Sequence, residues 1–275
     1  MPKALEPIAA AAVKVRPAAT TLVLRDGPAG FEVLMVRRST HATFMPSSYV
    51  FPWGAVDETD GEMQQYCDES TTKLNRRIGE VVGVGDKAGA FAVAALRECF
   101  EECGLWLGAG DQDTALLREL QSGRHGRTHF LELARAAGMC LSTSALHPWS
   151  RWVTPFGVAK RFDTVFFVVT APPGQTPEVD AGETTALEWV TPDSALAASE
   201  HGRFQMEFAT RRTIESLLPH AGGGVAALLA HAASMSRLPT VHPRLVLDAE
   251  LQVSGVLMPA DAGYDERGYF GSACS

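Results

Sequence analysis

The sequence is poor in cysteine and places its cysteines without a recognisable pattern. Five occur among 275 residues, and no two of them form a CxxC pair. The odd number and the spacing argue against a disulfide framework and against a zinc cluster. A reducing compartment fits this cysteine usage, so we expect a cytoplasmic protein. The apolar runs are also far too short to cross a bilayer, so we expect no membrane-spanning segment.

Positive charge is scarce as well. Lysine and arginine number 24 against 32 acidic residues, which gives a formal net charge of −8. Such a surface repels a phosphate backbone, so we expect no nucleic-acid partner. A small phosphorylated molecule remains an allowed partner, because a bound cation can reverse the local charge. The chain is 46% hydrophobic and 20% charged, which excludes a disordered chain and allows a substantial core.

Apolar runs separated by turn residues predict the secondary structure. Strands are expected at 20–24, 31–36, 49–51, 161–170 and 186–190, with a strand pair within 244–258. Helices are expected at 88–103, 192–199, 205–218 and 225–235, with two more within 111–139. Residues 57–89 are polar and glycine-rich without a clear period, so we expect a loop or insertion there, with room for a short helix. The mixed order of strands and helices favours an α+β fold.

The helix expected at 88–103 carries three acidic residues near its end. At about 100° per residue, Glu98, Glu101 and Glu102 share one sector, opposite an apolar sector. Carboxylates at this spacing repel one another, and the helix dipole disfavours anions at a C-terminus. Divalent cations would relieve both penalties, whereas the alternative is an ordinary solvated acidic face. Arg97 could hold Glu101 in place one turn away, or form a surface ion pair of little consequence.

The sequence around this helix resembles the Nudix family. Residues 97–105, RECFEECGL, are similar to REUxEExGU, the second half of the Nudix box, in which U is a bulky apolar residue. Gly54 and Asp60 match the first half, GxxxxxE, with aspartate in place of glutamate, and Asp60 precedes Arg97 by 37 positions. A long insertion at this point is typical of the subgroup similar to peroxisomal acyl-CoA diphosphatases. Residues 34–39, LMVRRS, and 51–54, FPWG, partly resemble the segment that precedes the box in coenzyme A-cleaving members.

The resemblance implies a Nudix fold, in which a mixed sheet lies between helices, and a metal-dependent hydrolase. Water would attack a diphosphate with the help of Mg²⁺ or Mn²⁺. Glu101 and Glu102 would be the principal metal ligands, Glu98 a third ligand or the general base, and the Gly54 carbonyl a further ligand. Glu183 is a second candidate for the base, although an ordinary turn residue is an equally good interpretation of it.

Substrate contacts are expected from the segments before and after the box. Arg37, Arg38 and Arg161 could bind substrate phosphates, although arginines at such positions are more often surface charges at strand edges. Trp53 replaces the first glycine of the usual FPGG segment and could stack on a flat group such as adenine. The alternative for Trp53 is an aromatic residue packed within its own loop.

The predicted organisation is one large domain. A flexible arm at 1–17 would precede a Nudix domain at 18–275, with an insertion at 61–89, a helical insert at 108–140 and an extension at 221–275. The substrate implied is coenzyme A or acyl-CoA, with ADP-ribose, NADH or a dinucleotide as alternatives. A binding or regulatory module without turnover is a third possibility, favoured by Trp53 and Asp60. Dimers are common among such proteins, so a homodimer is also allowed.

Overall fold

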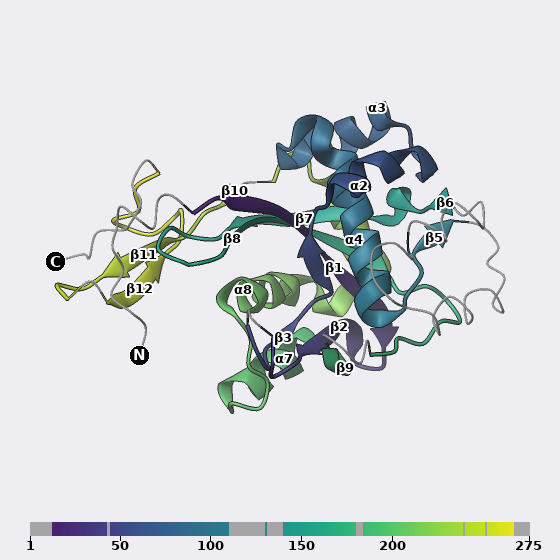
Figure 1. Cartoon of the computed structure of the whole chain (residues 1–275). Helices are drawn as coiled ribbons and strands as arrows, with labels where there is room; N and C mark the ends of the chain where they lie inside the picture. Colours follow the sequence, from purple (N-terminus) through teal and green to yellow (C-terminus); the bar gives the residue numbers. More distant parts are fainter. Residues whose placement is uncertain are drawn as a thin grey trace.

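The computed structural model describes residues 13–42, 45–109, 130, 140–179, 184–238, 240–250 and 252–266. A mixed sheet forms the centre of the molecule, with strands in the order β10-β7-β8-β1-β2-β3; β4 pairs with β1, and β9 pairs with β2 (Figure 1). The bounds are β1 Val15–Gly27, β2 Gly30–Arg38, β3 Tyr49–Val50, β4 Trp53–Ala55, β7 His147–Val153, β8 Arg161–Thr170, β9 Thr184–Val190 and β10 Thr240–Val241.

The two long central strands, β1 and β8, run parallel, whereas β1 and β2 form an antiparallel hairpin. The hairpin turns between Gly27 and Gly30, and Gly30 adopts a φ of +113°, which residues with a side chain rarely adopt. This turn and the strands predicted on either side of it are confirmed. Strand β1 begins at Val15, inside the segment expected to be a flexible arm.

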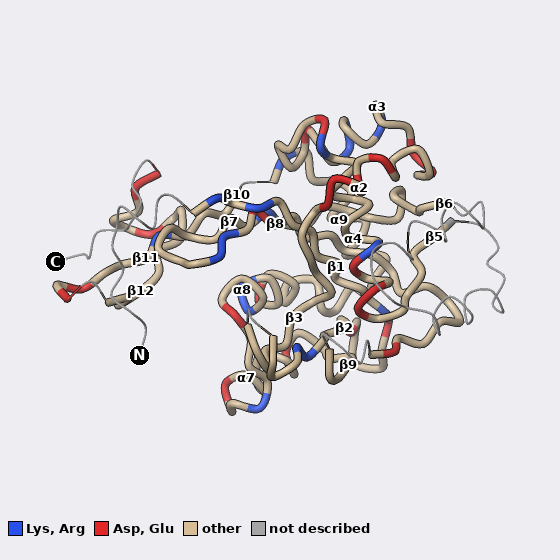
Figure 2. The backbone as a smooth tube through the Cα atoms, in the orientation of Figure 1, with Lys and Arg blue, Asp and Glu red and all other residues tan. Residues whose placement is uncertain are grey.

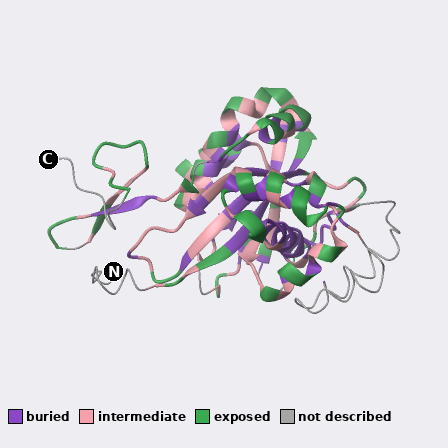
Figure 3. Cartoon of the chain, turned by 90° about the horizontal axis from the view of Figure 1, so that it is seen from above, coloured by how far each residue is buried: buried purple, intermediate pink, exposed green. Residues whose placement is uncertain are grey.

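Each face of the sheet is covered by helices, and the alternation of side chains along β1 separates two cores. Ala19 and Val23 pack with α4 (Ala88–Cys103) on one face. Leu22 and Leu24 point to the other face, where α7 (Pro192–Glu200), α8 (Phe208–Leu217) and α9 (Gly224–Ser234) lie. Figure 3 shows the buried segments gathered in the centre of the molecule. The predicted α+β sandwich is therefore confirmed.

The stretch after β4 holds several short helical turns, more than the single short helix that was expected within this loop or insertion. It contains short helical turns: α2 (Glu58–Glu62), η1 (Met63–Tyr66), α3 (Thr71–Leu74), η2 (Asn75–Glu80) and η3 (Gly85–Lys87). Met63, Leu74 and Ile78 are buried in the same core as α4. The helices change type every few residues, so no single hydrophobic period extends far enough to be recognised in the sequence.

Strand β7 is a second element that sequence reasoning missed. Its segment contains Pro148, which cannot donate a ladder hydrogen bond, and the register with β8 shifts between Pro148 and Ser150. The helices predicted within 111–139 lie outside the described residues, apart from position 130. Short strands on either side of that segment, β5 (Gly108–Ala109) and β6 (Cys140–Leu141), pair with each other, so its two ends lie side by side.

The C-terminal extension forms a separate hairpin. Strands β11 (Arg244–Leu247) and β12 (Val253–Leu257) pair antiparallel, as predicted, and lie at one end of the molecule (Figure 1). Among the residues that the structure describes, no helix combines the length and the apolar character needed to cross a membrane.

His242 joins β10 to β11 and should make the stability of the protein depend on pH. Burial, followed by the charges of Arg244 and Arg161, lowers its pKa from 6.5 to about 4. The unfolded chain therefore takes up a proton at a higher pH than the folded chain does. The contribution of His242 to stability is complete above pH 6.5 and is lost as the pH falls towards 4. We expect the free energy of unfolding to fall over this window, and to fall less in a His242→Gln variant.

Urea unfolding at about pH 7 and about pH 4.5 measures this effect, because the difference between the two free energies gives the proton uptake. His201→Gln is the matched control, since His201 is exposed at the end of α7. If both variants lose as much stability on acidification as the parent chain, His242 is not the titrating group.

Candidate active site

The acidic residues predicted as metal ligands lie in the last turns of α4 and are largely withdrawn from solvent. Glu98 is 9% exposed and Glu102 is 4% exposed, so the solvated acidic face considered as an alternative is wrong. The helix ends at Gly104, which has a φ of +68° and donates its N–H to the Phe100 carbonyl. Figure 2 shows acidic segments beside a basic one along this helix. Buried carboxylates at a helix C-terminus require a compensating charge.

Arg97 supplies that charge. Its guanidinium is 1% exposed and donates to Glu98 Oε1 at 2.6 Å and Glu101 Oε2 at 3.1 Å. It also donates to both carboxylate oxygens of Asp60, at 2.8 and 2.9 Å, and to the Ala55 carbonyl at 3.0 Å. Burial alone would lower the pKa of Arg97, but Asp60, Glu98 and Glu101 raise it above its ordinary value. The contact to Glu101 that was expected of Arg97 is present, and its burial makes Arg97 a positioning residue.

Asp60, which stands at the position of the glutamate of the usual box, reaches Arg97 despite its shorter side chain. It is 1% exposed and lies in α2, where Asp60 Oδ2 accepts the Asp57 N–H at 2.7 Å. The Asp57 side chain in turn accepts from the Asp60 N–H, which completes a capping box, and it also accepts from the Thr59 N–H at 3.2 Å. These bonds fix Asp60 against Arg97 across 37 positions of sequence. The two halves of the interrupted motif therefore meet in space.

Gly54 lies against the carboxylate of Glu98, as the predicted first half of the motif requires. Strand β4 pairs with β1 through Gly54 and Ala19, and a Cβ built on Gly54 would lie 2.1 Å from the Glu98 carboxylate. Only glycine fits this close approach. The neighbouring Trp53 N–H donates to Glu102 Oε2 at 3.1 Å, and Arg38 Nη1 lies 3.8 Å from Glu102 Oε1.

This donor set suits a hard divalent cation. Carboxylate and carbonyl oxygens are the ligands that such ions prefer, and the main chain at Gly54 closely approaches Glu98. Within the described part of the chain, no three acidic, histidine or cysteine side chains already surround a common point. A complete protein cage is not required, because Mg²⁺ is usually held by one or two carboxylates together with substrate phosphates.

Not all of the predicted substrate-binding arginines lie at this cluster. Arg38 does, whereas Arg37 is exposed on the opposite face of β2, 6.0 Å from the centroid of the Tyr49 ring. Arg161 is buried away from the carboxylates, donates to the Thr154 carbonyl at 3.1 Å and lies 4.0 Å from the centroid of the Phe156 ring. The expectation that Arg161 binds substrate phosphate is therefore replaced by a structural role.

Glu183, the second candidate for the general base, lies outside the described residues. Its neighbour Thr184 begins β9 and pairs with Arg38 of β2, whose side chain approaches Glu102. The first residue of β9 thus lies beside the strand that carries Arg38, and the role of Glu183 stays a prediction.

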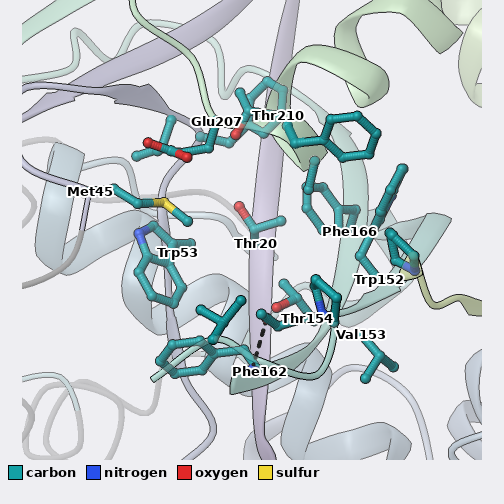
Figure 4. Close-up of a pocket in the computed structure, with 18 of the residues that line it drawn as sticks. Thr20, Met45, Trp53, Trp152, Val153, Thr154, Phe162, Phe166, Glu207 and Thr210 are labelled. Carbon is teal, nitrogen blue, oxygen red and sulfur yellow. Dashed lines mark hydrogen bonds between the residues drawn. The ribbon is translucent and has the colours of Figure 1, made fainter. Parts of the chain in front are cut away.

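A pocket of about 560 Å³ adjoins the cluster on the face of the sheet opposite α4. Figure 4 shows Trp53, Phe162 and Phe166 around it, with Thr210 of α8 on another side. Trp53 connects the two regions, because its N–H binds Glu102 whereas its indole lines the pocket. Sequence reasoning identified only Trp53. The other lining residues come from distant strands, loops and α8, so no local spacing indicates them.

Comparison with known proteins agrees with this geometry. The family model described as the NUDT19 Nudix domain matches residues 84–206. Acyl-coenzyme A diphosphatase NUDT19 from Homo sapiens is 29% identical over 222 residues, covering 66% of this chain and 59% of that protein. Its counterpart from Gallus gallus is 28% identical over 215 residues, covering 62% and 56%. The chain thus spans less than two thirds of the length of these relatives.

A solved structure extends the likeness to the fold. The crystal structure of a NUDIX hydrolase from Alicyclobacillus acidocaldarius superposes with a TM-score of 0.65 at 26% identity. The match covers 83% of this chain and 100% of that one. The two halves of the Nudix box, which meet at Arg97 in the structure, agree with these similarities. The chain has the fold of a Nudix hydrolase and is similar in sequence to the branch of that family that includes the NUDT19 proteins.

Proposed function

We propose that this chain is a metal-dependent diphosphatase that hydrolyses the pyrophosphate linkage of coenzyme A or acyl-CoA. The observation that carries the proposal is the buried Arg97, which fixes Glu98 and Glu101 beside Gly54 in the arrangement that the Nudix box requires. The substrate class comes from the acyl-coenzyme A diphosphatases to which the chain is similar.

In this mechanism Glu101 and Glu102 would hold the cation, and Glu98 would be a further ligand or the base. When bound, Mg²⁺ or Mn²⁺ neutralises phosphate charge and lowers the pKa of water. The Trp53 N–H orients Glu102 through its hydrogen bond to Oε2, and Arg38 adds positive charge beside the same carboxylate. Arg97 holds Glu98 and Glu101 before substrate arrives, which reduces the reorganisation needed during the reaction. Glu183 remains a candidate to accept the proton of the attacking water.

Two other functions remain distinct candidates. ADP-ribose, NADH or a dinucleotide contains the same diphosphate linkage and would use the same residues. A binding module without turnover was suggested by Trp53 and Asp60. The hydrogen bonds of Asp60 to Arg97 remove one reason for expecting inactivity, because the shorter carboxylate still reaches its partner.

The proposed metal, substrate class and location follow from ligand chemistry and from the composition of the chain. Oxygen ligands favour Mg²⁺ or Mn²⁺ over softer metals. The net charge of −8 favours a small nucleotide substrate over nucleic acid, and the cysteine usage favours a cytoplasmic location. A homodimer stays a prediction.

A substrate panel tests the function. The protein is incubated with Mg²⁺ or Mn²⁺ and with coenzyme A, acyl-CoA, ADP-ribose or NADH, and the products are separated by chromatography. We expect cleavage of coenzyme A or acyl-CoA into adenosine 3′,5′-bisphosphate and a phosphopantetheine. Faster cleavage of ADP-ribose or NADH than of coenzyme A would favour the alternative substrates over the proposed one. Tight binding without any turnover would support the non-catalytic module.

A further inference from the structure

We propose that the pocket beside Trp53 receives the acyl-pantetheine end of the substrate, so that the phosphoadenosine end points away from it. This inference rests on the proposed function and deepens it, because it assigns the two ends of an asymmetric substrate to different sides of the acidic cluster. It follows from the lining of the pocket, from its charge and from its connection to Glu102.

The lining is largely apolar and contains packed pairs of aromatic rings. Phe51 and Phe166 pack edge to face with ring centroids 6.3 Å apart, and Trp53 and Phe162 do so at 5.1 Å. Aliphatic side chains complete the surface, including Val256 of the C-terminal hairpin. A cavity of about 560 Å³ lies in the usual size range of small-molecule sites. Such a surface gains free energy by removing hydrocarbon from water.

The charge of the pocket argues against the phosphoadenosine end. Among the lining residues in the described part of the chain, none is lysine or arginine. The charged group that does line it is the carboxylate of Glu207, which accepts a hydrogen bond from Ser48 Oγ at 3.2 Å. The 3′-phosphate of coenzyme A is a dianion close to its adenine, and it would enter this pocket without a compensating cation.

Two of the hydroxyl groups that line the pocket, those of Thr20 and Thr154, are engaged with the main chain. Thr20 Oγ1 donates its proton to the Pro52 carbonyl at 2.7 Å, and Thr154 Oγ1 accepts the Phe162 N–H at 3.0 Å. The proton of Thr20 is therefore not available to the polar edge of a base. An alkyl chain, by contrast, needs no hydrogen-bonding partner.

Trp53 places the pocket next to the position expected for the diphosphate. Its N–H binds Glu102, its indole lines the pocket, and the Arg38 guanidinium lies 5.5 Å from the centroid of its ring. The positive charge of Arg38 thus lies on the side of Trp53 that faces Glu102, and the apolar surface of the pocket lies on its other side. A substrate bound across Trp53 would place its diphosphate at the cluster and its acyl-pantetheine arm in the pocket.

Two substitutions on one strand test the assignment. Val256→Trp adds bulk to the pocket, whereas Val253→Trp adds the same bulk at a site that is 47% exposed and outside the lining. Val256 is half-buried and far in sequence from the acidic residues, and circular dichroism of both variants checks folding. The probes are S-octanoyl phosphopantetheine and adenosine 3′,5′-bisphosphate, with binding measured by titration calorimetry in Mg²⁺.

We expect Val256→Trp to weaken octanoyl-phosphopantetheine binding at least about tenfold, because each methylene removed from water contributes about fourfold in affinity. Adenosine bisphosphate binding should not change, and neither probe should be affected by Val253→Trp. Weaker binding of adenosine bisphosphate alone would overturn the assignment, as would equal effects of the two substitutions. Selective loss of octanoyl-phosphopantetheine binding supports the pocket even if the parent chain cleaves no coenzyme A, so the two proposals can fail separately.

Discussion

Replacement of Glu101 and Glu102 together by glutamine is expected to lower kcat for the best substrate by roughly 10³-fold. Several kcal/mol of transition-state stabilisation by a bound cation corresponds to about this factor in rate. Glutamine keeps the size of each side chain but removes the negative charge that attracts the ion. Chromatographic product assays at saturating substrate measure the loss, and thermal unfolding with and without Mg²⁺ measures cation binding independently of turnover.

A matched control for this variant is available in α2. Glu58 and Glu62 are exposed residues of that helix, so Glu58→Gln combined with Glu62→Gln removes the same charge without touching the cluster. The control should keep both its turnover and its stabilisation by Mg²⁺. Undiminished activity in the Glu101 and Glu102 variant would show that the acidic cluster of α4 is not the reaction centre.

Replacement of Arg97 by methionine should produce the largest loss of stability among single substitutions at the site. It would leave the buried Asp60 and Glu98 and the partly buried Glu101 near one another without the guanidinium that they share. Removing one partner of a buried ion pair costs about 3–5 kcal/mol, because the remaining charge is uncompensated. Urea unfolding at neutral pH measures the free energy, and a second change, Asp60→Asn, should restore part of the loss.

The same substitution in an exposed ion pair provides the comparison. Arg212 contacts Glu215 at 2.8 Å in α8 with 44% of its side chain exposed, so Arg212→Met should cost less than about 1 kcal/mol. A loss in Arg97→Met no greater than that in Arg212→Met would mean that solvent, rather than Arg97, compensates the carboxylates.

The sequence predicts the helical part of the site well because the relevant physics is local. Glu98, Glu101 and Glu102 are separated by one helical turn or less, so their common sector follows from helical geometry alone. Arg97 lies directly before Glu98 in the same helix, so its place beside the three glutamates is also determined locally. What local spacing does not reveal is burial: Glu102 is 4% exposed because distant segments, including β4 and Arg38, pack around it.

The pocket lies beyond prediction from this single sequence. Thr20, Phe166 and Val256 meet only through strand register and the placement of the hairpin, and each is an ordinary residue in its own segment. Dependence on contacts between distant segments also explains why the sequence did not predict the position of Arg161. An arginine at the start of a strand can face a substrate or a carbonyl, and the position of Thr154 decides between them.

The bond between Asp60 and Arg97 has a consequence for how this family can diversify. Since that salt bridge joins the two ends of the interrupted motif directly, the catalytic geometry does not depend on how many residues lie between them. The entropic cost of closing a flexible loop rises slowly with its length, by about 0.6 kcal/mol for each doubling. The interval can therefore acquire new surfaces or partners over evolution while the acidic cluster around Arg97 keeps its arrangement.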